Sequence, residues 1–290
     1  MKNPIFTGVC TALVTPFKNG KINYDMLDCL LERQLSAGIS AIVLSGTTGE
    51  SPTLSDSEKI SIFRHAKNFC GNDCTIIAGT GSNNTRHTIT LSEEAEQAGA
   101  DALLIVSPYY NKSTSEGLYA HYSTVCSAVH IPVIIYNVPS RTGQDIPVSV
   151  YQKLAEISNM AGVKEASTSI NKALQIKSQC PADFSLWSGN DDMAVPVLSL
   201  GGAGVISVLS NIYPLETQAM AMAALAGDFD TASSLQIQLY PLITLLFREV
   251  NPIPVKAAME LIGYDCGPCR MPLSAASQDL QNRLRNILAH

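Results

Sequence analysis

The chain has few charged residues, and its basic residues form no cluster. Charged residues make up 15% of the 290 positions, and the 19 Lys and Arg are dispersed along a chain with a formal net charge of -6. A surface that binds nucleic acid or an anionic membrane needs basic residues gathered on one face. We therefore expect no nucleic-acid partner and no membrane partner, and a small soluble molecule is the favoured ligand.

Long uninterrupted apolar segments are also lacking. Near the N-terminus, proline and polar residues break the apolar core that a signal peptide would need: Pro4, Thr7, Thr11, Thr15 and Pro16. No later segment stays apolar for long enough to predict a membrane-spanning helix. The sequence therefore predicts a cytoplasmic protein.

Metal-binding and redox patterns are scarce. The five histidines show neither metal-ligand spacing nor a neighbouring carboxylate cluster, so we expect no catalytic metal. The eight cysteines are scattered through a chain large enough to fold without disulfides, and we interpret them as reduced thiols. Cys266 and Cys269 have the spacing of a redox dithiol, but they follow a helix-like run, which favours chance spacing.

What the sequence does contain is a regular alternation of apolar runs and amphipathic stretches. Runs rich in Val, Ile and Leu predict buried strands at eight places: 10–17, 41–46, 75–81, 102–110, 132–139, 161–167, 184–190 and 204–211. Stretches with apolar residues three and four apart predict helices between them, as at 24–38, 55–70, 85–99 and 115–129. Eight strand–helix units in roughly 220 residues predict an α/β fold, a (β/α)₈ TIM barrel rather than an open doubly wound sheet.

The alternation stops near residue 226. Residues 229–250 and 253–263 have helical spacing and no strand-like run. We predict a catalytic barrel at 1–226 and a small C-terminal helical extension at 227–290 that packs on the barrel. GGAGV at 201–205 precedes the eighth strand, at the wrong end of the barrel for an active site, and predicts a tight turn.

Polar residues that end the apolar runs are the candidates for an active site, because the carboxyl ends of barrel strands form it. The stretch LSGTTGES at 44–51 places Thr47 and Thr48 between Gly46 and Gly49. Glycine lets the backbone approach a ligand closely, and successive N–H groups at such a turn can bind a carboxylate or a phosphate. The other candidates are Tyr109, Tyr110, Tyr136, Arg141, Lys164 and Gly189.

Lys164 is the sharpest feature, because it lies within AGVKEAS, a segment that otherwise predicts a buried strand. Burial disfavours an ammonium group, and a desolvated lysine becomes a nucleophile that forms a Schiff base with a carbonyl substrate. An ion pair with Glu165, or a side chain that reaches the barrel mouth, is the structural alternative. Tyr136 could transfer a proton to such an intermediate, and Arg141 could bind a substrate carboxylate.

The motifs, taken in order, resemble those of a known family. They are TALVTPF, GTTGESPTL, AGTGSN, PYYNK, YNVPSRTG, GVKEAS, SGND and NPIPVKAAMELIG, spread from residue 11 to residue 263. The chain is similar to the pyruvate-dependent class I aldolases, the N-acetylneuraminate lyase superfamily, and within it to the dihydrodipicolinate synthase family. The resemblance implies a lyase that condenses pyruvate with L-aspartate 4-semialdehyde, the committed step of diaminopimelate and lysine biosynthesis. It implies no cofactor, because the covalent intermediate is an imine with the substrate pyruvate.

The resemblance also implies a catalytic set. Lys164 would form the imine with pyruvate, and Tyr136, Thr48 and Tyr110 would form a proton relay. Tyr110 would reach in from a neighbouring subunit. A tyrosine shared in this way implies an oligomer, and members of the family are usually homotetramers built as a dimer of dimers.

A substrate-binding set follows from the same resemblance. Thr47 and Thr48 would orient the pyruvate carboxylate, which favours carboxylate over phosphate at the glycine-flanked turn. Arg141 would hold the carboxylate of the semialdehyde. The backbone at Gly189 and Ile206 would line the site.

Other pyruvate-dependent aldolases form the alternative function. N-acetylneuraminate lyase and the keto-deoxy sugar acid aldolases share the threonines, Tyr136 and Lys164, whereas the sugar lyases lack an arginine at the position of Arg141. Arg141 therefore favours the amino-acid substrate. A metal- or phosphate-dependent barrel isomerase and a non-catalytic barrel with a relict site are more distant alternatives.

Regulation by lysine is the point at which the chain departs from the resemblance. Lysine-inhibited members bind lysine at a dimer interface, through positions that align with Ser51, Pro52, Asp56, Lys59, Asn83, His87 and Tyr109. A small residue, two histidines and a glutamate are typical there, and this chain has Pro52, Asp56, Lys59 and His87 instead. Lys59 and His87 would repel the amino groups of the ligand, so we predict weak or no inhibition by lysine.

Overall fold

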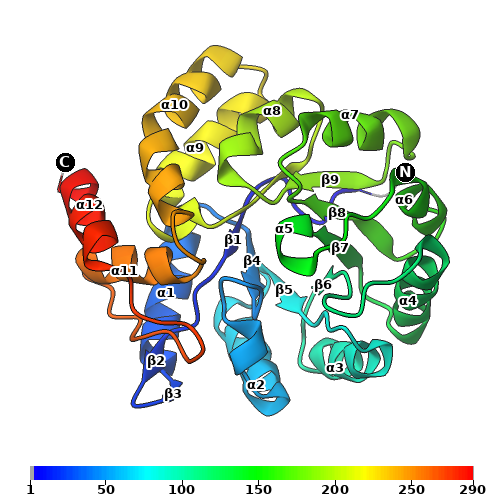
Figure 1. Cartoon of the computed structure of the whole chain (residues 1–290), viewed down its shortest axis with the longest axis horizontal. Coiled ribbons are helices and arrows are strands. Elements are labelled where there is room, and N and C mark those ends of the chain that lie inside the picture. Colours follow the sequence, from blue (N-terminus) through cyan, green and yellow to red (C-terminus); the bar gives the residue numbers. More distant parts are fainter. Residues whose placement is uncertain (1–2, 290) are drawn as a thin grey trace.

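A closed barrel of parallel strands, surrounded by helices, forms the centre of the molecule (Figure 1). The computed structural model describes residues 3–289. Around the barrel the strands follow the order β1-β10-β9-β8-β7-β6-β5-β4, and β1 closes the sheet by pairing with β4 and β10. The barrel strands are β1 Gly8–Ala12, β4 Ala41–Leu44, β5 Thr75–Gly79, β6 Ala102–Val106, β7 Val133–Asn137, β8 Met160–Glu165, β9 Ser185–Ser188 and β10 Gly204–Ser207. The predicted (β/α)₈ barrel is confirmed.

The strands are buried on both faces, which explains their continuous apolar runs. Side chains that point inward fill the barrel with a compact cluster that includes Cys10, Ile77, Leu104, Trp187 and Ile206. Side chains that point outward join a second, larger cluster with the helices. The barrel interior is therefore a packed core, and a ligand can enter only at its mouth.

Helices follow the barrel strands and cover the outside of the sheet (Figure 1). They are α1 Tyr24–Ser36, α2 Asp56–Cys70, α3 Thr85–Gln97, α4 Ser115–Ala128, α6 Val148–Leu154, α7 Ile170–Gln179, α8 Ala194–Ser199 and α9 Pro214–Leu225. Local sequence sets where they begin: Ser55 and Glu58 form a capping box at α2, and Asn84 caps α3. The helices that the sequence predicts at 24–38, 55–70, 85–99 and 115–129 are confirmed.

Several short elements differ from the sequence prediction. The run at 10–17 is not one strand, because β1 ends at Ala12 and Phe17 begins a small antiparallel ribbon of β2 Phe17–Lys18 and β3 Lys21–Ile22. A short helix, α5 Pro139–Thr142, follows β7. Three 3₁₀ turns also lie near the barrel mouth: η1 Ser51–Thr53, η2 Asp191–Met193 and η3 Leu209–Asn211. The tight turn predicted at 201–205 is confirmed, with Gly201 at φ 80°.

The C-terminal part of the chain is helical: α10 Phe229–Leu246, α11 Ile253–Leu261 and α12 Gln278–Leu288. In Figure 1, α10 lies beside α9, and α11 and α12 lie at the outer edge of the barrel near α1. Gln236 of α10 donates to the backbone oxygen of Asp191 at 2.7 Å, so this part touches a loop at the barrel mouth. The boundary predicted at 226/227 falls in the turn between α9 and α10, and the division into two domains stays a prediction.

Candidate active site

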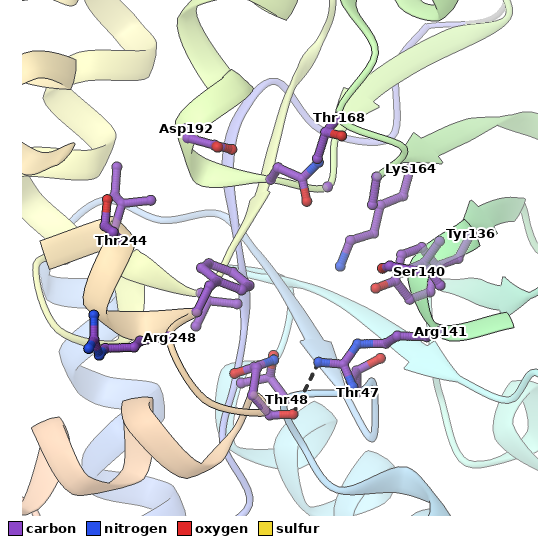
Figure 2. Close-up of a pocket in the computed structure, with 18 of the residues that line it drawn as sticks. Thr47, Thr48, Tyr136, Ser140, Arg141, Lys164, Thr168, Asp192, Thr244 and Arg248 are labelled. Atoms are coloured by element: carbon purple, nitrogen blue, oxygen red, sulfur yellow. Dashed lines mark hydrogen bonds between the residues drawn. The ribbon is translucent and has the colours of Figure 1, made fainter. Parts of the chain in front are cut away.

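The carboxyl ends of the strands open into a cavity of about 500 Å³ between the barrel mouth and α10 (Figure 2). Six residues predicted from the strand ends line it: Thr47, Thr48, Tyr136, Arg141, Lys164 and Gly189. In Figure 2, Lys164 extends into the cavity beside Tyr136, with Thr47 and Thr48 across from it. The barrel topology brings these residues together from strands that are far apart in the sequence.

Lys164 lies on β8 in register with Tyr136 on β7. Only 6% of its surface is exposed, and its Nζ lies 4.4 Å from the centroid of the Tyr136 ring. Gly189 leaves the space that the lysine side chain needs, because a Cβ there would lie 3.2 Å from Lys164 Cε and 2.7 Å from Ala166 Cβ. The amine therefore lies against the ring of Tyr136 and close to the backbone of Gly189, which has no side chain, and it faces the open cavity.

The ion pair between Lys164 and Glu165, considered as a structural alternative, does not form. Glu165 accepts hydrogen bonds from Asn137 Nδ2 at 2.9 Å, from the Ser167 N–H at 2.9 Å and from the Tyr151 hydroxyl at 3.3 Å. Burial raises the pKa of Glu165, against the opposing charge of Lys172. Successive side chains on a strand point to opposite faces, so Glu165 is turned outward and no described carboxylate pairs with Lys164.

The turn that carries Thr47 and Thr48 is held on both sides. The Ser51 N–H donates to Gly46 O at 3.2 Å, and the Thr15 hydroxyl donates to Gly49 O at 2.7 Å. A Cβ at Gly49 would lie 3.0 Å from the Ser45 nitrogen, so glycine is needed for the chain to fold back this closely. The glycines predicted to serve ligand approach therefore also shape the turn itself.

Arg141 lies on α5, which starts at Pro139 and is capped at its C-terminal end by Gly143 with φ 70°. Its Nη2 donates to the backbone oxygen of Asn251 at 3.3 Å. In Figure 2 the guanidinium group crosses the cavity wall toward Thr48. A planar, permanently charged group in this position suits a carboxylate that enters at the cavity mouth.

Three of the predicted residues do not line this cavity: Tyr109, Tyr110 and Ile206. Tyr110 has φ 69° and is 93% exposed, and it is not among the residues that line the cavity of its own chain. Ile206 is fully buried inside the barrel, whereas Val208 lines the cavity. The roles predicted for Tyr110 and Ile206 stay predictions.

The C-terminal helices supply a part of the wall that the strand-end rule misses. These residues are Tyr240, Ile243, Thr244, Phe247, Arg248 and Asn251. Their sequence pattern indicates a helix with an apolar face but not the surface against which it packs. The motif beginning at Asn251 was the available signal, and only the packing of the helices on the barrel places it at the cavity.

A second cavity, of about 600 Å³, lies on the other side of the wall formed by Thr47, Tyr136 and Arg141. Of the seven positions predicted for an allosteric site, six line it: Ser51, Pro52, Asp56, Lys59, His87 and Tyr109. Asn83 does not, although its backbone oxygen accepts from Asn111 Nδ2 at 2.9 Å.

Asp56 is already paired inside this second cavity. Its Oδ2 lies 2.8 Å from His87 Nε2, and its Oδ1 lies 3.6 Å from Lys59 Nζ. Although burial alone would raise the pKa of Asp56, the hydrogen bond and charge of His87 and the charge of Lys59 lower it. Burial lowers the pKa of Lys59, against the charge of Asp56. The single carboxylate of this group is thus occupied by two basic side chains.

The remaining sequence expectations concern thiols, metals and membranes. Burial raises the pKa of Cys266 to about 12 and that of Cys269 to about 11, and both lie in a loop after α11. Such thiols are poor nucleophiles, which agrees with chance spacing. Within residues 3–289, no group of three potential ligands could hold a metal ion. No helix of the described chain is long and apolar enough to span a membrane.

Comparison with known proteins gives a consistent result. Residues 5–290 match the model of the dihydrodipicolinate synthetase family. The chain is 47% identical over 274 residues to a 4-hydroxy-tetrahydrodipicolinate synthase of Acetivibrio thermocellus, covering 94% of this chain and 93% of the relative. It is 46% identical over 277 residues to that of Kosmotoga olearia, covering 94% of each. A solved dihydrodipicolinate synthase from Aquifex aeolicus superposes with a TM-score of 0.96 at 41% identity, covering 98% and 97% of the two chains.

Proposed function

Because the chain belongs to the dihydrodipicolinate synthetase family, we propose that Lys164 performs the family's reaction through an imine with pyruvate. The protein is a lyase that condenses pyruvate with L-aspartate 4-semialdehyde to 4-hydroxy-tetrahydrodipicolinate, in diaminopimelate and lysine biosynthesis. One observation carries the assignment of Lys164. It is a buried lysine that faces a cavity and has no carboxylate partner among the described residues.

The proposed chemistry proceeds from this amine. Lys164 Nζ attacks the keto carbon of pyruvate, and loss of one water leaves the imine. Loss of a methyl proton gives the enamine, whose carbon attacks the aldehyde of the semialdehyde. The amino group of the second substrate then displaces the lysine from the imine carbon and closes the ring. No metal or organic cofactor takes part in these steps, and we expect activity to persist in the presence of a chelator.

The proposed proton relay consists of Tyr136, Thr48 and the Tyr110 of a neighbouring subunit. Tyr136 lies against the lysine, and Thr48 lines the same cavity. Tyr110 is strongly exposed and is held in a left-handed backbone conformation, which fits a side chain directed into another subunit. We therefore propose a homotetramer built as a dimer of dimers, which light scattering of the purified protein tests.

The proposed binding groups are arranged around the lysine. Thr47 and Thr48 orient the pyruvate carboxylate, and Arg141 binds the carboxylate of the semialdehyde at the mouth. Gly189 keeps the backbone close to the lysine, and Ile206 supports the wall from inside the barrel.

Borohydride reduction in the presence of pyruvate tests the imine directly. We expect a reduced pyruvate adduct on the peptide that contains Lys164 and on no other lysine peptide. Omission of pyruvate is the control. A folded protein that gains no adduct, or gains it on a different lysine, would show that the proposed nucleophile is wrong.

We also propose that lysine inhibits the enzyme weakly or not at all. Asp56, the carboxylate in the second cavity, is held by His87 and Lys59, and the Lys59 ammonium group has only donors to present to an incoming amino group. Initial rates measured with increasing lysine should stay constant. Inhibition at low lysine concentrations would refute the proposal.

A cytoplasmic location is part of the same proposal. The eight cysteines, all within the described residues, form no disulfide, as expected in a reducing compartment. Fractionation of cells that produce the protein, followed by immunodetection, is the measurement.

A further inference from the structure

Asn251 connects the helical extension to the centre of the active site. It lies between α10 and α11, it is 5% exposed, and it lines the catalytic cavity. Its side-chain Nδ2 donates to Thr48 Oγ1 at 2.9 Å, and its backbone oxygen accepts from Arg141 Nη2 at 3.3 Å. One residue from outside the barrel therefore contacts both the proposed relay and the proposed carboxylate site.

The hydrogen bond to Thr48 has a fixed direction. An amide nitrogen is only a donor, whereas a hydroxyl both donates one proton and accepts. Thr48 Oγ1 must therefore be the acceptor from Asn251, and its single proton has to point elsewhere. Among the described residues, no other hydrogen bond is formed by the Thr48 hydroxyl, so the proton is free to point toward the cavity.

The orientation of the Asn251 side-chain amide does not contribute to the stability of the fold. Asn251 Oδ1 is buried and has no hydrogen-bond partner in the described chain. Buried amides usually satisfy both ends, and an unpaired buried acceptor destabilises a fold. Asn211 shows the usual case, because it is fully buried, its Nδ2 donates to Ala12 O at 2.9 Å and its Oδ1 accepts from the Val14 N–H at 3.1 Å. At Asn251, the side-chain nitrogen has a partner, the Thr48 hydroxyl, and the side-chain oxygen has none among the described residues.

We propose that Asn251 is a positioning residue that fixes the direction of proton transfer through Thr48. This inference rests on the proposed relay of Thr48 and Tyr136. Loss of water from the intermediate that precedes the imine requires a proton on the leaving hydroxyl, and Tyr136 is placed to deliver it. Asn251 donates to the Thr48 oxygen and so directs the Thr48 proton toward the Tyr136 oxygen. After passing this proton to Tyr136, Thr48 accepts a replacement proton through its second lone pair.

The substitution Asn251→Asp tests the direction, because it keeps the shape and replaces the donor by an acceptor. Thr48 would then donate to the introduced carboxylate, away from Tyr136. We expect kcat for the condensation to fall about 100-fold near pH 8, which is within the range of general acid–base contributions. The ratio of variant to wild-type kcat should rise as the pH falls, because the protonated carboxyl group can donate to Thr48 again.

Asn159→Asp is the control, at a half-buried amide whose Nδ2 donates to Cys126 O and to Val129 O, each at 2.9 Å. It makes the same chemical change at an amide that does not line the cavity. We expect it to lower the thermal midpoint and to leave the pH dependence of kcat unchanged. If Asn251→Asp gives the same pH dependence as the wild type and the control, the directional role is refuted, whatever the size of the loss.

Asn251→Ala gives a second test that introduces no charge. Because Asn251 acts through Thr48, Asn251→Ala should slow borohydride trapping of the imine about 10-fold in the wild-type background but not in Thr48→Val. Equal slowing in both backgrounds would overturn the inference. Trapping on Lys164 in the unmodified protein is measured first, and its failure would count against the proposed function rather than against Asn251.

Discussion

Two deeply buried lysines, one in the candidate active site and one in the contact between the barrel and the helical extension, lie equally close to an aromatic ring but differ in whether a carboxylate pairs with them. Lys164 is 6% exposed and Lys256 is 5% exposed. Each Nζ lies 4.4 Å from the centroid of an aromatic ring, Tyr136 in one case and Phe17 in the other. Lys256 also lies 2.8 Å from Glu50 Oε1, whereas no described carboxylate pairs with Lys164.

The difference teaches that burial alone does not identify a nucleophile. A carboxylate at hydrogen-bond distance stabilises a buried ammonium group, and an amine without one is left available for reaction. Lys172 follows the pattern of Lys256, because its Nζ pairs with Asp145. The counter-charge, rather than the depth of burial, separates the structural lysines from the proposed nucleophile.

Replacement of Lys164, the lysine that has no counter-charge, should have the largest effect, and this effect should be on activity rather than on stability. Lys164→Met is expected to lower kcat by at least about 1,000-fold, because the covalent step is lost. The free energy of unfolding from urea titration should not fall, because no buried partner is left unpaired. A marked loss of stability would show that Lys164 has an ion-pair role after all.

Removal of the paired lysine should affect stability instead. Lys256→Met leaves the Glu50 carboxylate, which is fully buried, without its partner, and should destabilise the fold by about 3–5 kcal/mol. The double variant Glu50→Gln/Lys256→Met should recover most of this loss. If the single variant unfolds at the same urea concentration as the wild type, the contrast between the two lysines fails.

Another buried basic group, His121, extends the comparison to pH. Burial lowers its pKa to about 4, and its Nδ1 lies 2.9 Å from the Thr85 hydroxyl. An unfolded histidine has a pKa near 6.5, so between about pH 6.5 and about pH 4 the unfolded state binds more protons than the folded state. Stability should therefore fall as the pH drops through this window, by up to about 3 kcal/mol.

The variant His121→Phe isolates this effect. It should be less stable than the wild type at neutral pH by an amount that shrinks as the pH falls. Urea titrations of both proteins at about pH 7.5 and about pH 4.5 give the comparison. Parallel losses of stability in the two proteins would contradict the assignment.

The smallest effect is expected at the two cysteines beside the contact of Lys256. Lys256 Nζ donates to Pro268 O at 3.3 Å, between Cys266 and Cys269. If the ion pair and not a thiol pair holds this loop, Cys266→Ser/Cys269→Ser should change kcat less than about 2-fold and stability by about 1 kcal/mol or less. Sensitivity of the unmodified enzyme to a thiol reductant would show that the cysteines do matter.

The sequence predicts the barrel and most of the lysine's neighbours for one physical reason. Alternation of buried strands and amphipathic helices is a local pattern, and the barrel topology then places every strand end at one mouth. Thr47, Thr48, Tyr136, Arg141 and Lys164 follow from that rule alone.

Local sequence patterns do not predict which side chains pair when they are far apart in the sequence. The hydrogen bonds that Glu165 accepts come from Asn137 and Tyr151, and the helix that presents Arg141 is too short to show periodicity. The motif at Asn251 is readable in the sequence. That its amide donates to Thr48, and that its acceptor stays unpaired, depends on how the helical extension packs against the barrel.

The contacts that hold the turn around Thr48 and Glu50 also determine when the site can form during synthesis of the chain. Asn251 reaches Thr48 across 203 positions, Lys256 reaches Glu50 across 206, and the Arg270 N–H reaches Glu50 across 220. A ribosome that adds 5–20 residues per second needs roughly 10 to 40 s to cover such a distance. A nascent chain therefore carries its lysine and its threonines well before it can complete the site. We therefore expect activity to begin only after Arg270 has been made, and we expect cleavage that removes the segment from Asn251 to Arg270 to abolish it.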